Sequence, residues 1–312
     1  MPSTRAIKGK IRSVQKTHQV TKAMEAVSGV KMRKAQLSAL VARPYAMSAF
    51  RILSRITRSV DIASHPLVVT RPIHRVLLVI VTSDKGLAGG LNSGVTKRAL
   101  QTLRDIGIAK ESTGVLAIGR KGEDFFARRG YILEKHIQTM KDESAISDFS
   151  SVVSLITKMF TDGTYDECVL VYTNFRSTFE QEPVSRTLLP LSLDGLKEMI
   201  KGIVPEKGAF AEAKVKEGVN EDSQATSSDY LFEPSPEAVF ETLIPRLLAI
   251  ELHHAFLESK ASEHSARMVA MRNASDKAEE VTFDLTREYN KVRQGAITRE
   301  MSEIIGGIEA MK

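Results

Sequence analysis

The sequence lacks the features of a secreted, membrane-spanning or disulfide-stabilised protein. It contains no Trp, and aromatic residues make up only 6% of the chain, so the core is expected to be aliphatic. Its single cysteine, Cys168, allows no internal disulfide and lies in the apolar run "CVLVY", where a buried, unreactive thiol is expected. The longest aliphatic run, "VLLVIV", is far shorter than the ~20 residues of a membrane-spanning helix. Without a recognisable secretory signal, we expect a soluble or peripheral protein in a reducing compartment.

Acidic residues are almost absent from the first 60 positions. This segment holds 13 Lys and Arg against one acid, Glu25, so its formal charge is +12. The whole chain has a net charge of +6, which leaves −6 for the remainder. Such a concentration of positive charge predicts an acidic partner, which could be nucleic acid, lipid headgroups or an acidic protein.

Both ends of the chain have the apolar periodicity of long helices. In residues 1–60, small and apolar residues recur every three or four positions from Ile7 to Ile56. A second stripe runs from Leu243 to Ala296 and then shifts by one position to Ile297, Met301, Ile304 and Ile308. Periodic helices of this length are typical of coiled coils, and small residues let two helix backbones approach closely.

Each of these helices is too long to be buried within a domain of this size. At about 1.5 Å per residue, ~55 residues extend about 80 Å and ~75 residues about 110 Å. We therefore expect the two helices to pack antiparallel on each other, with a globular domain inserted between them. The longer helix would then extend beyond its partner over residues 292–312, where unpaired apolar residues predict a contact with another protein.

The middle of the chain has an alternating pattern of strands and helices. Short apolar runs at 75–81, 114–119 and 167–173 predict strands, the stretches between them predict helices, and 183–191 predicts an edge strand. This order is typical of an α/β fold with a parallel sheet covered by helices. We predict four segments: an N-terminal coiled-coil helix (1–60), a Rossmann-like α/β domain (70–200), a variable loop or linker (201–234) and a C-terminal coiled-coil helix (235–312).

The glycine-rich turn after the first strand raises the alternative of a nucleotide-binding enzyme. Its glycines, Gly86, Gly89, Gly90 and Gly94, match neither the dinucleotide fingerprint nor the phosphate-binding loop, and a structural turn is favoured. His254, Glu258 and His264 lie on the C-terminal helix, where packed histidines are favoured over a metal site. The residues therefore predict neither a catalytic group nor a cofactor. A second alternative is a basic coiled-coil protein that binds nucleic acid, although no recognised motif accompanies the charge.

Four stretches resemble the gamma subunit of the rotary F-type ATP synthase. "IKGKIRSVQKTHQVTKAMEAVSGVKMRKAQ" (7–36) is similar to the opening helix of that family. "ASEHSARMVAMRNASDKAEE" (261–280) with "YNKVRQGAITREMSEI" (289–304) is similar to its closing helix, and "TSDKGLAGGLN" (82–92) and "DYLFEP" (229–234) match its middle. The resemblance implies a long antiparallel coiled coil of the terminal helices with an inserted Rossmann-like parallel-sheet domain.

The resemblance also implies a function, partners and a location. The chain would be the central rotor shaft of a proton-translocating ATP synthase, coupling rotation of the membrane ring to conformational change at the catalytic sites of the alpha/beta hexamer. It would be non-catalytic and bind no cofactor. Its partners would be the alpha and beta subunits, the epsilon subunit and the membrane c-ring, with no nucleic acid and no insertion into the bilayer. We expect a peripheral position on the cytoplasmic face of a bacterial plasma membrane.

Finally, the resemblance implies which residues contact the hexamer. The collar contacts of the family correspond to Met24 in the opening helix and to Arg293, Gln294, Thr298 and Glu300 in the closing helix. A Met24→Lys substitution is then expected to place a charge beside Arg293. The apolar positions Ile297, Met301, Ile304 and Ile308 would form a hydrophobic tip inside the hexamer.

Overall fold

The computed structural model describes residues 4–59, 65–137, 140–191, 233–309 and 311. It has two compact units, one made of Met1–Gly29 with Arg267–Lys312 and the other of Val30–Ala266. We call them the helical unit and the α/β unit. Two long helices, α1 (Thr4–Ser59) and α7 (Pro236–Glu309), each contribute to both units.

The α/β unit is built around a five-stranded sheet with strand order β3-β2-β1-β4-β5. The strands are β1 (Val76–Val81), β2 (Thr113–Ile118), β3 (Ile132–Ile137), β4 (Glu167–Phe175) and β5 (Gln181–Leu189). The first four are parallel, and β5 pairs antiparallel to β4 at the edge, which confirms the predicted edge strand. The sequence pattern had not revealed β3, because "ILEKHI" carries three polar residues and lies at the opposite edge.

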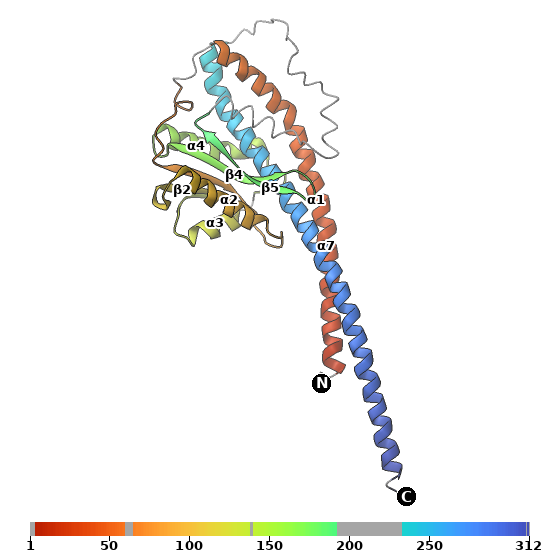
Figure 1. Cartoon of the computed structure of the whole chain (residues 1–312). Coiled ribbons are helices and arrows are strands. Elements are labelled where there is room, and N and C mark those ends of the chain that lie inside the picture. Colours follow the sequence, from red (N-terminus) through yellow and green to blue (C-terminus); the bar gives the residue numbers. More distant parts are fainter. Residues whose placement is uncertain (1–3, 60–64, 138–139, 192–232, 310, 312) are drawn as a thin grey trace. The chain divides into compact units, whose positions relative to one another are not determined.

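Alternating residues of the central strands form two separate cores, one on each face of the sheet. Val76, Leu78 and Ile80 of β1 face α2 (Leu91–Ile106) and α3 (Arg120–Ala127). Leu77, Val79 and Val81 face α4 (Ser150–Thr161) and the first part of α7. Two short 3-10 helices, Lys110–Ser112 and Ile146–Phe149, precede β2 and α4. Helices on both faces of a mainly parallel sheet are the layer arrangement expected from the sequence (Figure 1).

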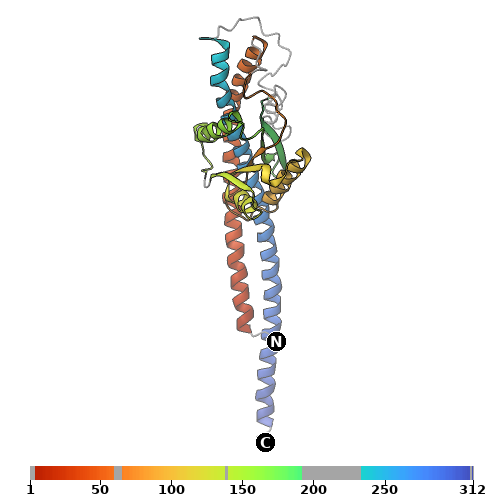
Figure 2. The same ribbon diagram turned by 90° about the vertical axis from the view of Figure 1, so that its left-hand side faces the viewer.

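The helical unit consists of the first part of α1 packed antiparallel on the last part of α7, and both views show them side by side (Figures 1 and 2). Its buried positions are mostly small or polar: Thr21 and Ser28 on α1, and Ser275 and Ala278 on α7. A Cβ added at Gly29 would lie 3.2 Å from the Met268 Sδ, so the backbones approach closely at this glycine. The predicted seam of small residues is therefore confirmed in this unit.

These observations confirm the predicted fold class, with terminal helices that pack on each other and an inserted, mainly parallel sheet. The division into segments 1–60, 70–200, 201–234 and 235–312 remains a prediction. Most of the predicted linker, residues 201–232, lies outside the described residues.

Candidate functional site

The glycine turn between β1 and α2 is closed by its own side chains. The Ser83 N–H donates to Asn92 Oδ1 over 3.0 Å, and Asn92 Nδ2 donates to Ser83 Oγ over 2.7 Å. Gly89 has a φ of 56° and Leu87 a φ of 64°, so the turn uses the left-handed region twice. Gly89 meets this requirement at little steric cost, which supports a structural role for this glycine, whereas Leu87 adopts the same region with a side chain.

The start of α3, where an anion could bind in this fold, is also occupied by protein groups. The Arg120 N–H donates to Asp84 Oδ1 over 3.1 Å, and the Lys121 N–H donates to the Ser83 carbonyl over 3.1 Å. The Gly122 N–H donates to Thr82 Oγ1 over 2.8 Å. A phosphate at a helix N-terminus would use these same donors. The residues that follow β1 therefore satisfy three N–H groups at the start of α3.

The chain segments that follow β1 and β2 also approach each other closely. A Cβ added at Gly119 would lie 2.0 Å from the Thr82 carbonyl oxygen, and Gly119 has a φ of 98°. Among the described residues, no group of three or more His, Cys, Asp or Glu side chains could hold a metal ion. The thiol of Cys168 is buried as predicted, and burial raises its pKa.

The predicted collar residues lie on exposed surface of the helical unit. Arg293, Gln294, Thr298 and Glu300 are exposed on α7, and Met24 is half-buried on α1. The contact between Gly29 and Met268 sets the antiparallel register, in which Met24 lies level with about residue 273. Arg293 lies about 20 residues further along α7, or about 30 Å at the rise of a helix. The expectation that Met24 and Arg293 lie beside each other is therefore wrong, because the register of the two antiparallel helices sets them apart.

The apolar positions of the predicted tip are exposed. Ile297 is 48% exposed, Met301 57%, Ile304 63% and Ile308 55%. Val292 and Ala296 are half-buried, and every position from Ile297 to Ile308 is exposed. Figures 1 and 2 both show α7 continuing beyond the N-terminal end of α1.

Several further exposed apolar residues of the helical unit lie outside the predicted tip, including Ile305 at 57% and Met311 at 83%. Val20 and Val27 on α1 are 58% and 56% exposed, and Phe283 on α7 is 71% exposed. Val20 and Val27 are seven residues apart, so they occupy one face of the helix, a spacing that the sequence already contained. Phe283 lies between the seam positions Thr282 and Leu285, and its periodicity gave no separate signal.

In the α/β unit, α7 carries two buried carboxyl groups that face the sheet. Burial raises the pKa of Glu251 to about 7 and that of Glu258 to about 8, and Arg186 of β5 opposes both shifts. Glu258 also forms a side-chain hydrogen bond with Tyr172 of β4, and its Oε1 lies 3.9 Å from the His254 Nε2. His254 and His264 are both buried, as predicted for packed histidines.

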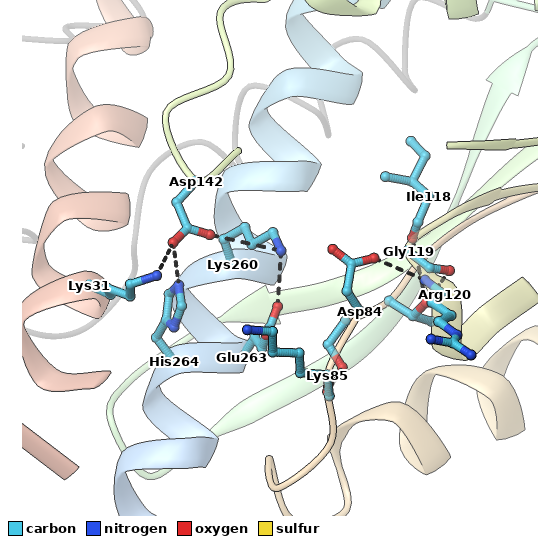
Figure 3. A network of polar contacts seen from close by, with 12 residues as sticks. Lys31, Asp84, Lys85, Ile118, Gly119, Arg120, Asp142, Lys260, Glu263 and His264 are labelled. Carbon is cyan, nitrogen blue, oxygen red and sulfur yellow. Dashed lines mark hydrogen bonds and ion pairs between the residues drawn. The ribbon is translucent and has the colours of Figure 1, made fainter. Parts of the chain in front are cut away.

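A second polar cluster joins the segment before α4 to both long helices within this unit (Figure 3). The Asp142 carboxylate accepts a hydrogen bond from Lys31 Nζ of α1 over 2.9 Å. It also lies 3.3 Å from His264 Nε2 and 3.9 Å from Lys260 Nζ, both on α7. The hydrogen bond with His264 is the largest of the effects that lower the pKa of Asp142. Three basic groups surround the Asp142 carboxylate and favour its ionised form, and Lys260 also lies 3.2 Å from the Glu263 carboxylate.

Comparison with known proteins gives a consistent result over the full length. A family model described as "ATP synthase" matches residues 3–311. Two similar relatives are ATP synthase gamma chains from Roseiflexus castenholzii, 40% identical over 100% of this chain and 99% of the relative, and from Heliobacterium modesticaldum, 36% identical over 100% of both chains.

Solved structures show the same fold. A chain of the Euglena gracilis mitochondrial ATP synthase aligns with a TM-score of 0.63 and 19% identity, covering 99% of this chain and 94% of that one. A chain of the Tetrahymena thermophila mitochondrial ATP synthase central stalk and c-ring aligns with a TM-score of 0.57 and 22% identity, covering 82% of this chain and 99% of that one.

Proposed function

The chain belongs to the gamma-chain family of ATP synthase, and we propose that it is the central rotor shaft of a proton-translocating F-type enzyme. As a subunit of this complex, it couples rotation of the membrane ring to conformational change at the catalytic sites of the alpha/beta hexamer. Each rotational position of an asymmetric shaft contacts the three chemically identical sites differently. Those differential contacts bias each site between its open and closed states.

The exposed apolar stretch from Ile297 to Ile308 carries this proposal. Over one face of a helix, four large apolar side chains are each about half exposed. Patches of this kind mark contacts with other proteins. We propose that they form the hydrophobic tip that turns inside the hexamer, and that they need no directional bonds because a rotating contact meets several neighbours in turn.

Polar residues beside the tip supply the collar contacts. Arg293 and Gln294 offer a guanidinium fork and an amide, and both are exposed. The Thr298 hydroxyl donates to the Gln294 carbonyl over 3.0 Å, which places the two residues on one helix face. Glu300 follows on the exposed surface. Met24 contacts the hexamer separately, at its own level of the shaft, where its flexible thioether tolerates a sliding surface.

We propose that the chain itself is non-catalytic and that the chemistry takes place on the beta subunits. The closed glycine turn and the occupied N-terminus of α3 support this assignment. The alternative of a nucleotide-binding enzyme through the Gly86–Gly94 turn has no support in these contacts. The family match gives no support to the alternative of a nucleic-acid-binding coiled coil.

The partners follow from the rotor role: the alpha and beta subunits, the epsilon subunit and the c-ring. Among the described residues, no helix is long and apolar enough to span a bilayer. We place the chain peripherally on the cytoplasmic face of a bacterial plasma membrane. The positive charge of α1 would then meet acidic surfaces of these partner subunits.

Co-purification of the full-length chain with alpha, beta and epsilon subunits tests the proposal. We expect an ATP-hydrolysing complex with a 3:3:1 ratio of alpha, beta and this chain. Replacing Ile304 and Ile308 by Asp should weaken assembly and lower proton pumping per ATP hydrolysed in membrane vesicles. Replacing Phe179 by Asp, an exposed residue of the β4–β5 turn in the other unit, serves as a control. Full pumping by the Ile304/Ile308 variant would contradict the role of the tip.

A further inference from the structure

Within the α/β unit, the stretch of α7 from Glu251 to Ser265 is buried at every position although most of its residues are polar. A helix that only packs on a sheet needs an apolar face there. Buried polar side chains cost free energy unless they find hydrogen-bond partners. Their partners therefore show what this stretch does besides packing.

Three serines on this stretch bond to the backbone of the sheet. Ser259 Oγ accepts a hydrogen bond from the Thr173 N–H over 3.2 Å, and Ser262 Oγ donates to the Thr173 carbonyl over 3.4 Å. Ser265 Oγ donates to the Thr178 carbonyl in the β4–β5 turn over 2.7 Å. Ser262 and Ser265 are 0% exposed, and Ser259 is 6% exposed. We call these three bonds the serine contacts.

Two of the serine contacts are made to β4 at a point where β1 no longer pairs with it. The pairing of β1 with β4 ends at Ile80 and Val171, so Thr173 lies beyond the end of β1. On the other side, Thr173 faces Pro183 of β5, which has no N–H to donate. Thr173 is 2% exposed, and Ser259 and Ser262 supply hydrogen-bond partners for its buried N–H and carbonyl groups. The helix therefore completes the hydrogen bonding of the sheet at this point.

The Asp142 cluster holds the same stretch of α7 through different residues. Lys260 and His264 of α7 both approach the Asp142 carboxylate, which is also bonded to Lys31 of α1 (Figure 3). Asp142 belongs to the segment that precedes α4, whereas the serine contacts reach β4 and its turn. Two separate parts of the α/β unit thus bind one stretch of helix.

The hydrophobic effect is non-directional, whereas hydrogen bonds weaken steeply when their geometry changes. We propose that the serine contacts and the Asp142 cluster fix the rotational angle and register of α7 on the sheet. In the rotor role proposed above, on which this inference rests, they transmit torque between the α/β unit and the shaft without slip. Ser259, Ser262, Ser265 and Asp142 are then positioning residues for energy coupling.

Torsional stiffness in the assembled complex tests this inference. The hexamer is fixed to a surface, and a bead is attached through a cysteine at the exposed position Lys158 of α4. The angular variance of the bead is recorded while the rotor waits for ATP. We expect a larger variance when Ser259, Ser262 and Ser265 are all replaced by Ala. Matched controls are Thr282→Ala and Thr286→Ala, whose hydroxyls bond only to carbonyls of α7 itself, and these should leave the variance unchanged.

Hydrogen exchange of the full-length chain gives a second readout that does not depend on rotation. Loss of the serine contacts should speed amide exchange in β4 by roughly 100-fold, as expected for three neutral hydrogen bonds. If the triple variant does not assemble, Ser265→Ala and Asp142→Asn are measured singly in the same two assays. Unchanged variance and unchanged exchange in these variants would overturn the inference. A wild-type chain that fails to assemble or rotate would instead contradict the proposed function.

Discussion

Replacement of the buried Glu258 by Gln should change how the stability of the α/β unit depends on pH. Burial raises the pKa of this carboxyl from 4.5 to about 8 in the folded chain. The folded state therefore holds a proton that the unfolded state has released over the range between these two values. Stability from this group is fully present below pH 4.5 and is lost as the pH rises through about 8.

The size of the effect follows from this difference. Each pH unit in the window costs about 1.4 kcal/mol of unfolding free energy, because one proton is released on unfolding. Between pH 6 and pH 8 the wild-type chain should lose about 2 kcal/mol through Glu258. Gln is nearly isosteric, remains neutral and can still bond to the Tyr172 hydroxyl. The unfolding free energy of the variant should therefore lack this part of the decrease with pH.

Urea denaturation followed by tyrosine fluorescence can measure the difference. The chain has no Trp, and Tyr165 and Tyr172 are both buried in the core of the α/β unit. Glu111→Gln, at an exposed position in the same unit, is the control and should keep the wild-type slope. If the unfolding free energies of wild type and Glu258→Gln changed equally with pH between pH 6 and pH 8, the assignment of a buried, protonated carboxyl at this position would be refuted.

Three further predictions concern the core and the closed turn. Phe126→Ala, at a position that is 0% exposed, should lower the unfolding free energy by about 3–5 kcal/mol in urea denaturation; a loss below about 1 kcal/mol would contradict its tight packing. Gly119→Ala should destabilise by more than about 2 kcal/mol in the same assay, since its φ is 98° and the new Cβ would meet the Thr82 carbonyl; wild-type stability would show that the backbone can move apart. Cys168 should react with a thiol reagent only after denaturation, and rapid labelling of the native chain would disprove its burial.

The sequence was sufficient for the parts of the fold that depend on local periodicity. The apolar runs of β1, β2 and β4 and the long stripes of α1 and α7 are strong signals because each buries one repeating face. The strand β3 was missed because an edge strand with exposed charges has no such face.

The contacts between distant segments could not be predicted in this way. Nothing in the pattern "LESKASEHS" shows that its serines bond to Thr173, since this depends on where β1 ends and on a proline in β5. Likewise, Asp142 stands in a polar stretch that resembles an ordinary loop. The expectation for Met24 and Arg293 failed for a related reason, because motif positions alone do not give the register of two antiparallel helices.

The carboxylate of Asp84 and the hydroxyl of Thr82 accept hydrogen bonds from N–H groups at the start of α3 that could otherwise bind an anion. Because groups of the same chain satisfy these N–H donors, the α/β unit keeps this arrangement without a bound small molecule. A rotor subunit that transmits force needs a structure that does not change with the concentration of nucleotide.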